Sequence, residues 1–259
     1  GKIKDLEISR VFCGGNLIGG WAHSRDLIYV SPLIKAYHTD EKICETFRLA
    51  EQRGINTVLT NPVSSRVINA YRKAGGKIQW ISDCASSNFK DAVKGSVDSG
   101  ADAVYLQGGM CDKFVRDGQI KQVEEALSFM KDQLVPCGLG AHCLETVRKC
   151  VEAGFTPDFW VKTLHRDDYW SATPEANRQN FDELKASKEH DRAHDNMWCT
   201  NPKETIAYMA TLKKPWIAFK TLAAGALHPR HAFQWCFENG ADFLCVGMFD
   251  FQVDEDAAI

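Results

Sequence analysis

The sequence predicts an α/β fold: a (β/α)8 TIM barrel, in which eight parallel strands close on themselves inside a ring of helices. Three observations favour it. A unit of amphipathic helix, glycine, polar residues and apolar run recurs along the chain. The apolar runs do not alternate with polar residues, which indicates strands buried on both faces. Eight such strands alternate with eight helices over 259 residues, as this barrel requires.

The recurring unit is clearest in five places, where a glycine stands just past the end of a helix. A glycine there supplies the left-handed conformation that ends a helix before the next strand begins. The five units begin at Gly54, Gly76, Gly100, Gly154 and Gly240.

Taken in order, each strand is an apolar run and each helix an amphipathic stretch. The strands are predicted at 10–16, 56–61, 78–83, 103–107, 136–142, 158–165, 215–222 and 243–250. The helices are predicted at 40–53, 64–74, 88–99, 119–133, 143–153, 202–212, 230–239 and 251–258. The sixth of these helices has a clear start, with Asn201 as N-cap and Pro202 at its first position.

One connection is far longer than the two to six residues usual in such units. Residues 166–200 form an insertion after the sixth strand, and long loops at that end of a barrel serve as lids or substrate walls. No linker divides the chain, so we expect one domain over residues 1–259.

Composition excludes several classes of partner. The net charge of −3 and the pI of about 6.3 leave no basic face for nucleic acid. No stretch approaches the ~20 apolar residues of a membrane span. The expected partner is therefore a small molecule, with a homo-oligomer left open.

Ten cysteines occur without a CxxC pair, which argues against a zinc ribbon or a thioredoxin-type motif. Several stand at core positions of strands and helices, so we expect them to be buried and reduced. That usage favours a reducing compartment such as the cytoplasm. The chain begins with Gly1 and shows no signal peptide, but a leader could have been removed, so the periplasm stays open.

Polar residues end most of the predicted strands. The C-terminal ends of barrel strands meet in one bowl, where active sites of this fold lie. The first strand runs into Gly14, Gly15 and Asn16. The other seven end on Asn61, Asp83, Gln107, His142, His165, Lys220 and Asp250.

Several stretches together resemble the aldo-keto reductases. They are the opening strand and glycine turn from Ile8 to Trp21, the second strand after Gly54, the fifth strand Gly138-Leu-Gly-Ala-His, and Ile217-Ala-Phe-Lys-Thr-Leu-Ala-Ala-Gly. The resemblance covers nearly the whole chain except residues 166–200. It implies the barrel fold, whereas activity has to be judged from the site itself.

The catalytic residues of that family are missing from the matching positions. The reductases use an Asp, Tyr, Lys and His tetrad beside a reduced nicotinamide. The matching positions hold Leu59, Pro62–Ser65, Ser82 or Asp83, and Gln107 or Gly108. The segment expected to bind the cofactor phosphate carries Asp250, Asp254 and Glu255, which would repel it. We therefore expect no NADP as cofactor.

Two histidines end consecutive strands and suggest a divalent metal ion. Imidazole is a common metal ligand, and a catalytic site takes about three protein ligands and one open position. We expect His142 and His165 as ligands, with His194 as the third and Asp83, Gln107 or Glu145 as alternatives. Each histidine could instead simply bond a backbone carbonyl.

Lysine and aspartate supply candidate groups for proton transfer. Asp83 could act as base or ligand, and Lys220 could hold a keto or enolate oxygen, with His165 as a further catalytic candidate. Alternatively, Lys220 could form a structural ion pair with Asp250 or Asp83. Lys162 lies within a strand, where it would face the bowl or an ion pair.

The insertion supplies aromatic side chains beside polar ones. Tyr169, Trp170 and Trp198 could stack on a sugar ring. Asn61, Gln107 and Lys162 would then bind its polar groups. The tryptophans could instead anchor the insertion to the barrel.

The same segments resemble a group of bacterial proteins named as reductase-like from their fold, some of which accompany enzymes that oxidise glycosides at C3. That resemblance implies a carbohydrate substrate and a lyase, hydratase or isomerase that removes a proton from a keto-sugar. Cleavage of a 3-keto-glycoside, assisted by a metal ion, is the favoured reaction. The alternatives are an NADP-dependent oxidoreductase with an altered site and a non-catalytic barrel that binds a ligand.

Overall fold

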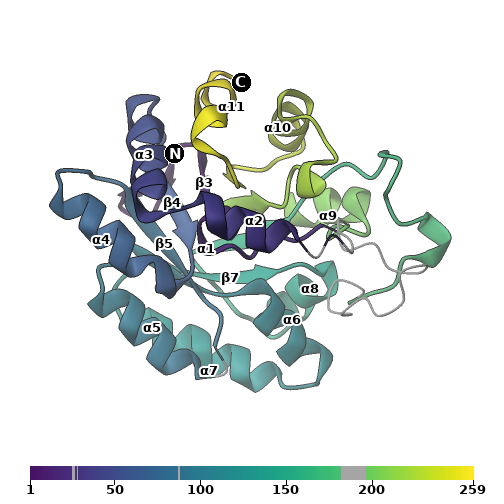
Figure 1. Cartoon of the computed structure of the whole chain (residues 1–259). Helices are drawn as coiled ribbons and strands as arrows, with labels where there is room; N and C mark the ends of the chain where they lie inside the picture. The colour runs from purple at the N-terminus through teal and green to yellow at the C-terminus, as the bar shows by residue number, and fades with distance from the viewer. Residues whose placement is uncertain (25–26, 28, 87, 182–196) are drawn as a thin grey trace.

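The computed structural model contains a closed barrel of eight parallel strands, in the order β10, β3, β4, β5, β6, β7, β8, β9 (Figure 1). It describes residues 1–24, 27, 29–86, 88–181 and 197–259. The predicted (β/α)8 barrel is thereby confirmed. The strands are β3 Val11–Gly14, β4 Thr57–Thr60, β5 Gln79–Cys84, β6 Ala103–Leu106, β7 Cys137–Ala141, β8 Phe159–Thr163, β9 Trp216–Phe219 and β10 Phe243–Val246.

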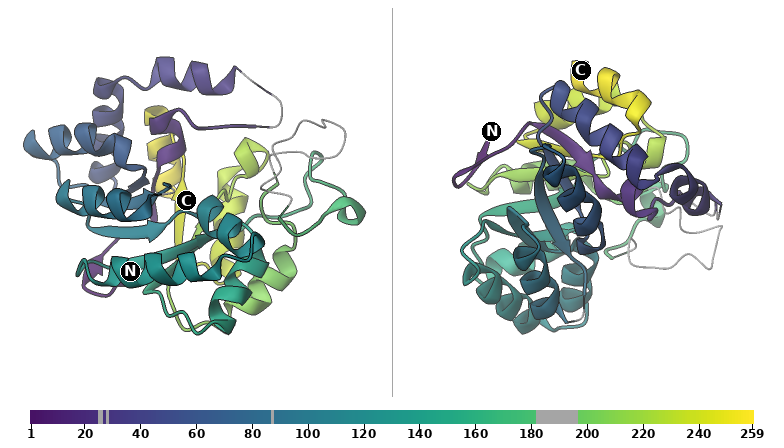
Figure 2. Two further views of the ribbon diagram at one scale, coloured as in Figure 1. Left: turned by 90° about the horizontal axis from the view of Figure 1, so that it is seen from below. Right: turned by 60° about the vertical axis from the view of Figure 1, so that its left-hand side comes forward.

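All eight predicted helices are present, with ends that differ by a few residues from those expected. They lie outside the strands in each view (Figures 1 and 2). They are α3 Asp40–Gln52, α4 Ser65–Lys73, α5 Phe89–Asp98, α7 Ile120–Lys131, α8 Leu144–Glu152, α9 Pro202–Met209, α10 Pro229–Glu238 and α11 Val253–Ala258. The last helix packs against α3, where Arg53 pairs with Asp254 at 2.7 Å.

Several shorter elements were not predicted from the sequence. A hairpin of β1 Lys2–Ile3 and β2 Leu6–Glu7 precedes the barrel, and short 3-10 turns lie at Pro62–Ser64, Glu175–Asn177, Ala223–Gly225 and Asp250–Gln252. Three further helices are α1 Gly15–Gly19, α2 Val30–Tyr37 and α6 Gly108–Arg116. The last begins with two glycines, which are poor helix formers and hid it from the periodicity.

The cassette glycines end their helices as predicted, with one exception. Gly54 has a φ of +83°. In the second unit, however, the left-handed residue is Gly75, with a φ of +103°, and not Gly76. Adjacent glycines carry the same signal, so the sequence could not distinguish them.

The polar residue of the cassette has a structural task that the sequence did not reveal. Its side chain accepts a hydrogen bond from the backbone N–H near the start of the preceding strand. Asp102 accepts from Trp80 at 2.7 Å, Asp158 from Cys137 at 2.9 Å, and Asp242 from Trp216 at 2.8 Å. These contacts join neighbouring strands at the N-terminal end of the barrel, opposite the strand ends with the candidate residues.

The core fills the barrel and the space between strands and helices. Trp80, Trp160, Phe12, Phe47 and Phe159 are among the largest fully buried side chains. All ten cysteines are free, and all but Cys44 are buried, as expected from the sequence.

Strand register decides which side chains face the barrel interior. Ser82 bonds Ser96 of α5 at 2.9 Å and so faces outward. Because side chains alternate along a strand, Asp83 faces inward. Its partner in register on the next strand is Tyr105.

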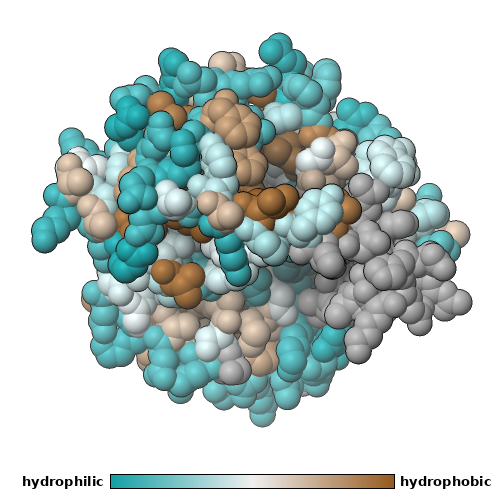
Figure 3. Space-filling view, in the orientation of Figure 1, coloured by the Kyte–Doolittle hydropathy of each residue, from teal (hydrophilic) through white to brown (hydrophobic). Residues whose placement is uncertain are grey.

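The surface seen in Figure 1 is mostly hydrophilic, with apolar side chains gathered in the middle of this face around α1 and α2 (Figure 3). Leu33 and Tyr29 near α2 are 60% and 57% exposed. None of the helices that the structure describes is long and apolar enough to cross a membrane.

Candidate active site

The C-terminal ends of the strands, called the mouth below, bring the predicted residues to one end of the barrel. Asn61 follows β4, Asp83 lies in β5, Gln107 follows β6, His142 follows β7 and Lys220 follows β9. The parallel, closed topology places these residues around one rim. Their contacts divide them into groups with different tasks.

Asp83 has the environment expected of an acid–base group. It is half-buried, and Asn61 Nδ2 donates to its Oδ1 at 2.9 Å. Burial raises the pKa of the Asp83 carboxyl to about 7, although the hydrogen bond from Asn61 opposes that rise. A carboxyl with a pKa near neutrality can both take and return a proton at physiological pH.

Tyr105 and Cys245 lie near Asp83 inside the barrel. Both are buried, and burial raises the pKa of each above its ordinary value, with a smaller contribution from the Asp83 charge. These two neighbours of Asp83 are therefore buried and uncharged. This accounts for the desolvation of the carboxyl.

His142 is held by Asp112, a residue that the sequence did not single out. His142 Nδ1 lies 2.9 Å from Asp112 Oδ2, and the ring packs against Phe219 with 5.1 Å between centroids. Burial lowers the pKa of His142, and the hydrogen bond to Asp112 opposes this while nearby lysines add to it. Among the described residues Nε2 has no hydrogen-bond partner.

His165 is not available for the chemistry expected of it. Its Nδ1 lies 2.8 Å from the Arg166 carbonyl, and its Nε2 accepts from the backbone N–H groups of Trp198 and Cys199 at 3.1 and 3.0 Å. Burial lowers the pKa of His165 to about 4, so the ring is neutral. The predictions that His165 is a catalytic residue and a metal ligand are therefore wrong, because both nitrogens are engaged by backbone. The alternative reading, a carbonyl-bonded histidine, holds instead.

The expected three-histidine metal site is not assembled from the described residues. In that part of the chain no three His, Cys, Asp or Glu side chains are gathered as a metal ion requires. His194, the third predicted ligand, lies outside the described residues. A divalent metal therefore stays a prediction that depends on His142 and His194.

Lys220 lies at the mouth in a strained backbone conformation. Its φ is +56°, which is unfavourable for any residue except glycine. Its Nζ lies 4.3 Å from the centre of the Trp198 ring and 3.3 Å from His23 Nε2. Asp250, one of the two ion-pair partners considered for Lys220, pairs with Lys42 at 2.9 Å.

Two predicted substrate contacts have structural tasks. Lys162 is fully buried, and its Nζ donates to the carbonyl and hydroxyl of Thr163 at 3.0 and 2.8 Å. Because no part of it is exposed, it does not reach a substrate, and that prediction is corrected. Gln107 caps α6 by accepting from Met110 N at 3.1 Å. Its role towards a substrate stays a prediction.

The aromatic residues of the insertion differ from one another. Trp198 is buried, and its carbonyl accepts from the Thr163 hydroxyl at 2.7 Å, so it anchors the insertion as the alternative proposed. Tyr169 is buried against His165, with 5.9 Å between ring centroids. Trp170, in contrast, is 85% exposed. Stacking of Tyr169 and Trp170 on a sugar stays a prediction.

Sequence reasoning missed Asp112, His23 and Tyr105. Asp112 lies on α6, a helix without a clear sequence signal, and its partner is thirty residues away in the chain. His23 follows the glycine turn and contacts Trp198, with 5.3 Å between ring centroids. Tyr105 could have been found, because it stands two residues before a predicted strand end and so faces the same side.

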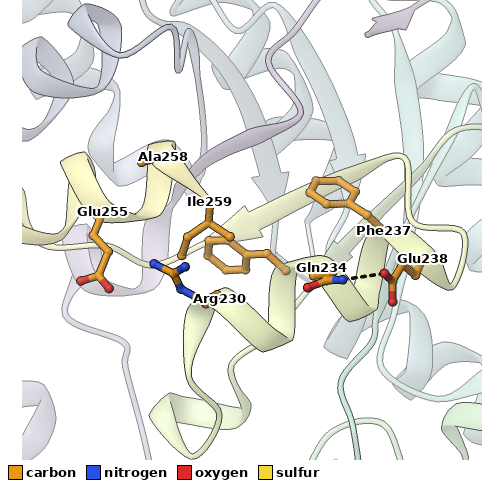
Figure 4. A pocket seen from close by; sticks show the side chains of 8 residues that line it. Arg230, Gln234, Phe237, Glu238, Glu255, Ala258 and Ile259 are labelled. Carbon is orange, nitrogen blue, oxygen red and sulfur yellow. Dashed lines mark hydrogen bonds between the residues drawn. The ribbon is translucent and has the colours of Figure 1, made fainter.

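A groove of about 500 Å³ lies elsewhere, between α10 and α11 on the outside of the barrel (Figure 4). It is lined by Arg230, Phe233, Gln234, Phe237, Glu238, Glu255, Ala258 and Ile259. None of the predicted site residues contributes to it, so it is separate from the mouth.

Comparison with known proteins supports the fold. No family model matches the sequence, and no curated protein matches it either. A structure provisionally described as an aldo-keto reductase from Pseudomonas aeruginosa is similar to 98% of this chain and 89% of its own, at a TM-score of 0.61 and 16% identity. A second structure with that description and organism matches with the same coverage and identity, at a TM-score of 0.60.

A structure described as QR15, an aldolase, matches 84% of this chain and 88% of its own at 14% identity, with a TM-score of 0.49. At such identities a structural likeness speaks for the fold and not for the reaction. The chain is thus an aldo-keto reductase-like (β/α)8 barrel.

Proposed function

We propose that this chain is an enzyme that removes a proton next to the carbonyl group of a keto-sugar and thereby breaks a carbon–oxygen bond, with a 3-keto-glycoside as the favoured substrate. The observation that carries the proposal is Asp83. It lies at a strand end in the mouth, half-buried, with a pKa near 7. General bases are tuned towards neutrality in this way.

The proposed step balances without a redox partner. The Asp83 carboxylate takes the proton from the carbon beside the ketone, and the electron pair of that bond forms an enolate. The enolate then re-forms the ketone while its carbon–carbon double bond expels the alkoxide from the next carbon. The alkoxide takes a proton back from the Asp83 carboxyl, so an enone and an alcohol leave and the enzyme is restored.

Lys220 is the proposed partner of the enolate oxygen. Its ammonium group lies at the mouth over Trp198, on the side of the barrel away from Asp83. A cation aimed at the position where negative charge develops lowers the barrier to proton abstraction. The mouth therefore combines a base on β5 with positive charge after β9, which suits an enolate.

A divalent metal ion is a separate part of the proposal. His142 Nε2 is the described donor that could hold it, together with His194, and an ion there would polarise the ketone. Because His165 does not fit as a ligand, the mechanism above uses no step through a metal. Metal content of the purified protein, compared between wild type and His142→Ala, tests this part: a bound ion requires stoichiometric metal that the variant loses.

The central test uses a chromogenic keto-glycoside. Purified protein is incubated with p-nitrophenyl 3-keto-glucoside and, in parallel, with the unoxidised glucoside. We expect nitrophenol from the first only, since the ketone is what makes the neighbouring proton acidic. Asp83→Asn should lower kcat by about 10²–10⁴-fold. Asp98→Asn, an exposed change at the C-terminal end of α5 and so at the opposite end of the barrel, is the control and should leave the rate unchanged.

Equal rates for Asp83→Asn and wild type would contradict the proposal.

A second outcome would favour the NADP-dependent oxidoreductase that the fold resemblance suggests. Two of the three carboxylates that led us to expect no NADP are neutralised, Asp250 by Lys42 and Asp254 by Arg53. Quenching of protein fluorescence by NADPH, together with NADPH-dependent ketone reduction, would favour that alternative.

A further inference from the structure

Asp112 is a buried carboxylate whose partners all come from the turn after β7. Its side chain is completely buried on α6. Oδ2 accepts from the backbone N–H of His142 at 2.8 Å and lies 2.9 Å from Nδ1 of the same residue. Oδ1 accepts from the backbone N–H of Cys143 at 3.3 Å. One carboxylate thus binds three nitrogens of two consecutive residues.

The backbone contacts alone would make Asp112 a helix cap supplied from another element. Cys143 is the N-cap of α8, and its own side chain makes no capping hydrogen bond. A carboxylate at that position satisfies free N–H groups and interacts favourably with the helix dipole. Capping explains two of the three contacts but does not require the imidazole ring.

The third contact has a consequence for the ring. A carboxylate can only accept, so the Nδ1 that faces it must carry a proton. A neutral imidazole then has its lone pair on Nε2. Phe219 packs against the ring at 5.1 Å and limits its rotation. The orientation and the tautomer are therefore fixed together.

We propose that Asp112 is a positioning residue that holds His142 as the Nδ1–H tautomer, so that in the metal-free site Nε2 accepts a hydrogen bond from a hydroxyl group of a polyhydroxylated substrate, a role that excludes a metal ion on the same nitrogen. The inference rests on the proposed function and adds a substrate contact to it. His142 follows β7 and Asp83 lies in β5, with β6 between them. Strands are ~4.8 Å apart, so roughly 10 Å separates the two residues along the rim, enough for a sugar ring to lie between them.

The substitution Asp112→Ala discriminates this role from capping. An amide could still turn its oxygen towards both nitrogens of His142, whereas alanine removes every acceptor. We expect the wild-type His142 ring to show protonated Nδ1 and unprotonated Nε2 in two-bond ¹H–¹⁵N NMR spectra. In the variant the Nε2–H tautomer should appear, and KM should rise roughly tenfold, the equivalent of one lost hydrogen bond, with kcat changed less.

Asp158→Ala is the matched control. Asp158 accepts from the backbone N–H of Cys137 at 2.9 Å, at the opposite end of the same strand, but bonds no histidine. It should lose stability without a change in the His142 tautomer or in KM.

Two results would overturn the inference: an Nε2–H tautomer in the wild type, or an unchanged tautomer and KM in Asp112→Ala. The wild-type spectrum decides the first even if the variant does not fold. It also needs no substrate, so a correct tautomer in a protein that cleaves no keto-glycoside would refute the proposed reaction while leaving the positioning of His142 intact.

Discussion

Asn61 controls the acidity of Asp83 through one hydrogen bond, which makes it a sensitive probe of the site. The bond to Asp83 Oδ1 stabilises the charged form and so lowers the pKa that burial raises. In Asn61→Ala the pKa should move above about 7. A hydrogen bond worth about 1 kcal/mol corresponds to roughly 0.7 pH unit.

The measurement is the pH dependence of kcat/KM. Because the base must be ionised, activity rises with pH through the pKa of Asp83, and the variant should shift this rise to higher pH. Asn69→Ala, which removes a side chain bonded to the Ser99 carbonyl at 2.9 Å, is the control and should not shift it. A rise at the same pH in wild type and Asn61→Ala would show that Asp83 is not the titrating base.

At the scale of single residues, the sequence could predict which side chains lie at the mouth. It could not predict which of them have atoms free to contact a substrate. Asp83 and Lys220 were identified because they end predicted strands, and the C-terminal ends of barrel strands meet at the mouth by topology alone. The same argument predicted His142 and His165 alike as metal ligands, since both end strands. Their difference lies in partners far away in the chain: the Asp112 carboxylate for His142, and the Trp198 and Cys199 amides for His165.

Among the elements, the contacts between neighbouring strands give a stability prediction. Asp102 accepts from the N–H of buried Trp80 and pairs with Arg72. Asp102→Ala should lower the free energy of unfolding by about 1–3 kcal/mol, since it leaves a buried donor unsatisfied. Asp102→Asn should lose less because it keeps an acceptor.

Urea unfolding checks this prediction, with Asp98→Ala as control. Asp98 is exposed on α5 and pairs with Lys94 at 2.6 Å, a surface pair worth between 0 and about 1 kcal/mol. Equal losses of unfolding free energy in Asp102→Ala and Asp98→Ala would show that the contact between Asp102 and Trp80 contributes no more than a surface ion pair.

The end of the insertion depends on His165. In His165→Phe the ring shape is kept, but the buried N–H groups of Trp198 and Cys199 lose their acceptor. We expect a loss of about 2–5 kcal/mol in the free energy of unfolding, which chemical denaturation measures. His231→Ala, at an exposed position of α10, should cost little. A loss of unfolding free energy as small as that of His231→Ala would mean that water can replace His165 as the acceptor for these two N–H groups.

Helices and strands were predictable where a hydrophobic pattern extends over their whole length. The helices and strands of the barrel all followed from period and glycine position. Helix α6 did not, because Gly108 and Gly109 open it and its stability comes from burial of Cys111, Asp112 and Phe114. Asp112 lies on α6, so failing to predict this helix also meant failing to predict the carboxylate that holds His142.

For the whole molecule, buried ionisable groups act on stability in opposite directions. Burial raises the pKa of Asp83 to about 7 and that of Asp256 to about 6, both above the unfolded value near 3.9. The folded state keeps these protons longer, so stability falls as pH rises from about 4 towards the folded pKa. His165, with its pKa lowered to about 4, makes stability fall as pH drops from about 6.5.

Asp83→Asn should therefore stabilise the fold, and more so at high pH. An amide carries no charge, so the variant avoids the cost of ionising a buried carboxyl. Its advantage over wild type should grow between about pH 4 and pH 7 and then level off, reaching a few kcal/mol, because each pKa unit corresponds to about 1.4 kcal/mol. Asp256→Asn should level off earlier, near pH 6, and exposed Asp98→Asn should show no trend. Unfolding free energies across this pH range decide the matter. A difference that does not vary with pH would mean that Asp83 ionises normally, whereas the expected trend beside a loss of catalysis would show that the fold gives up stability to keep this carboxyl at the mouth.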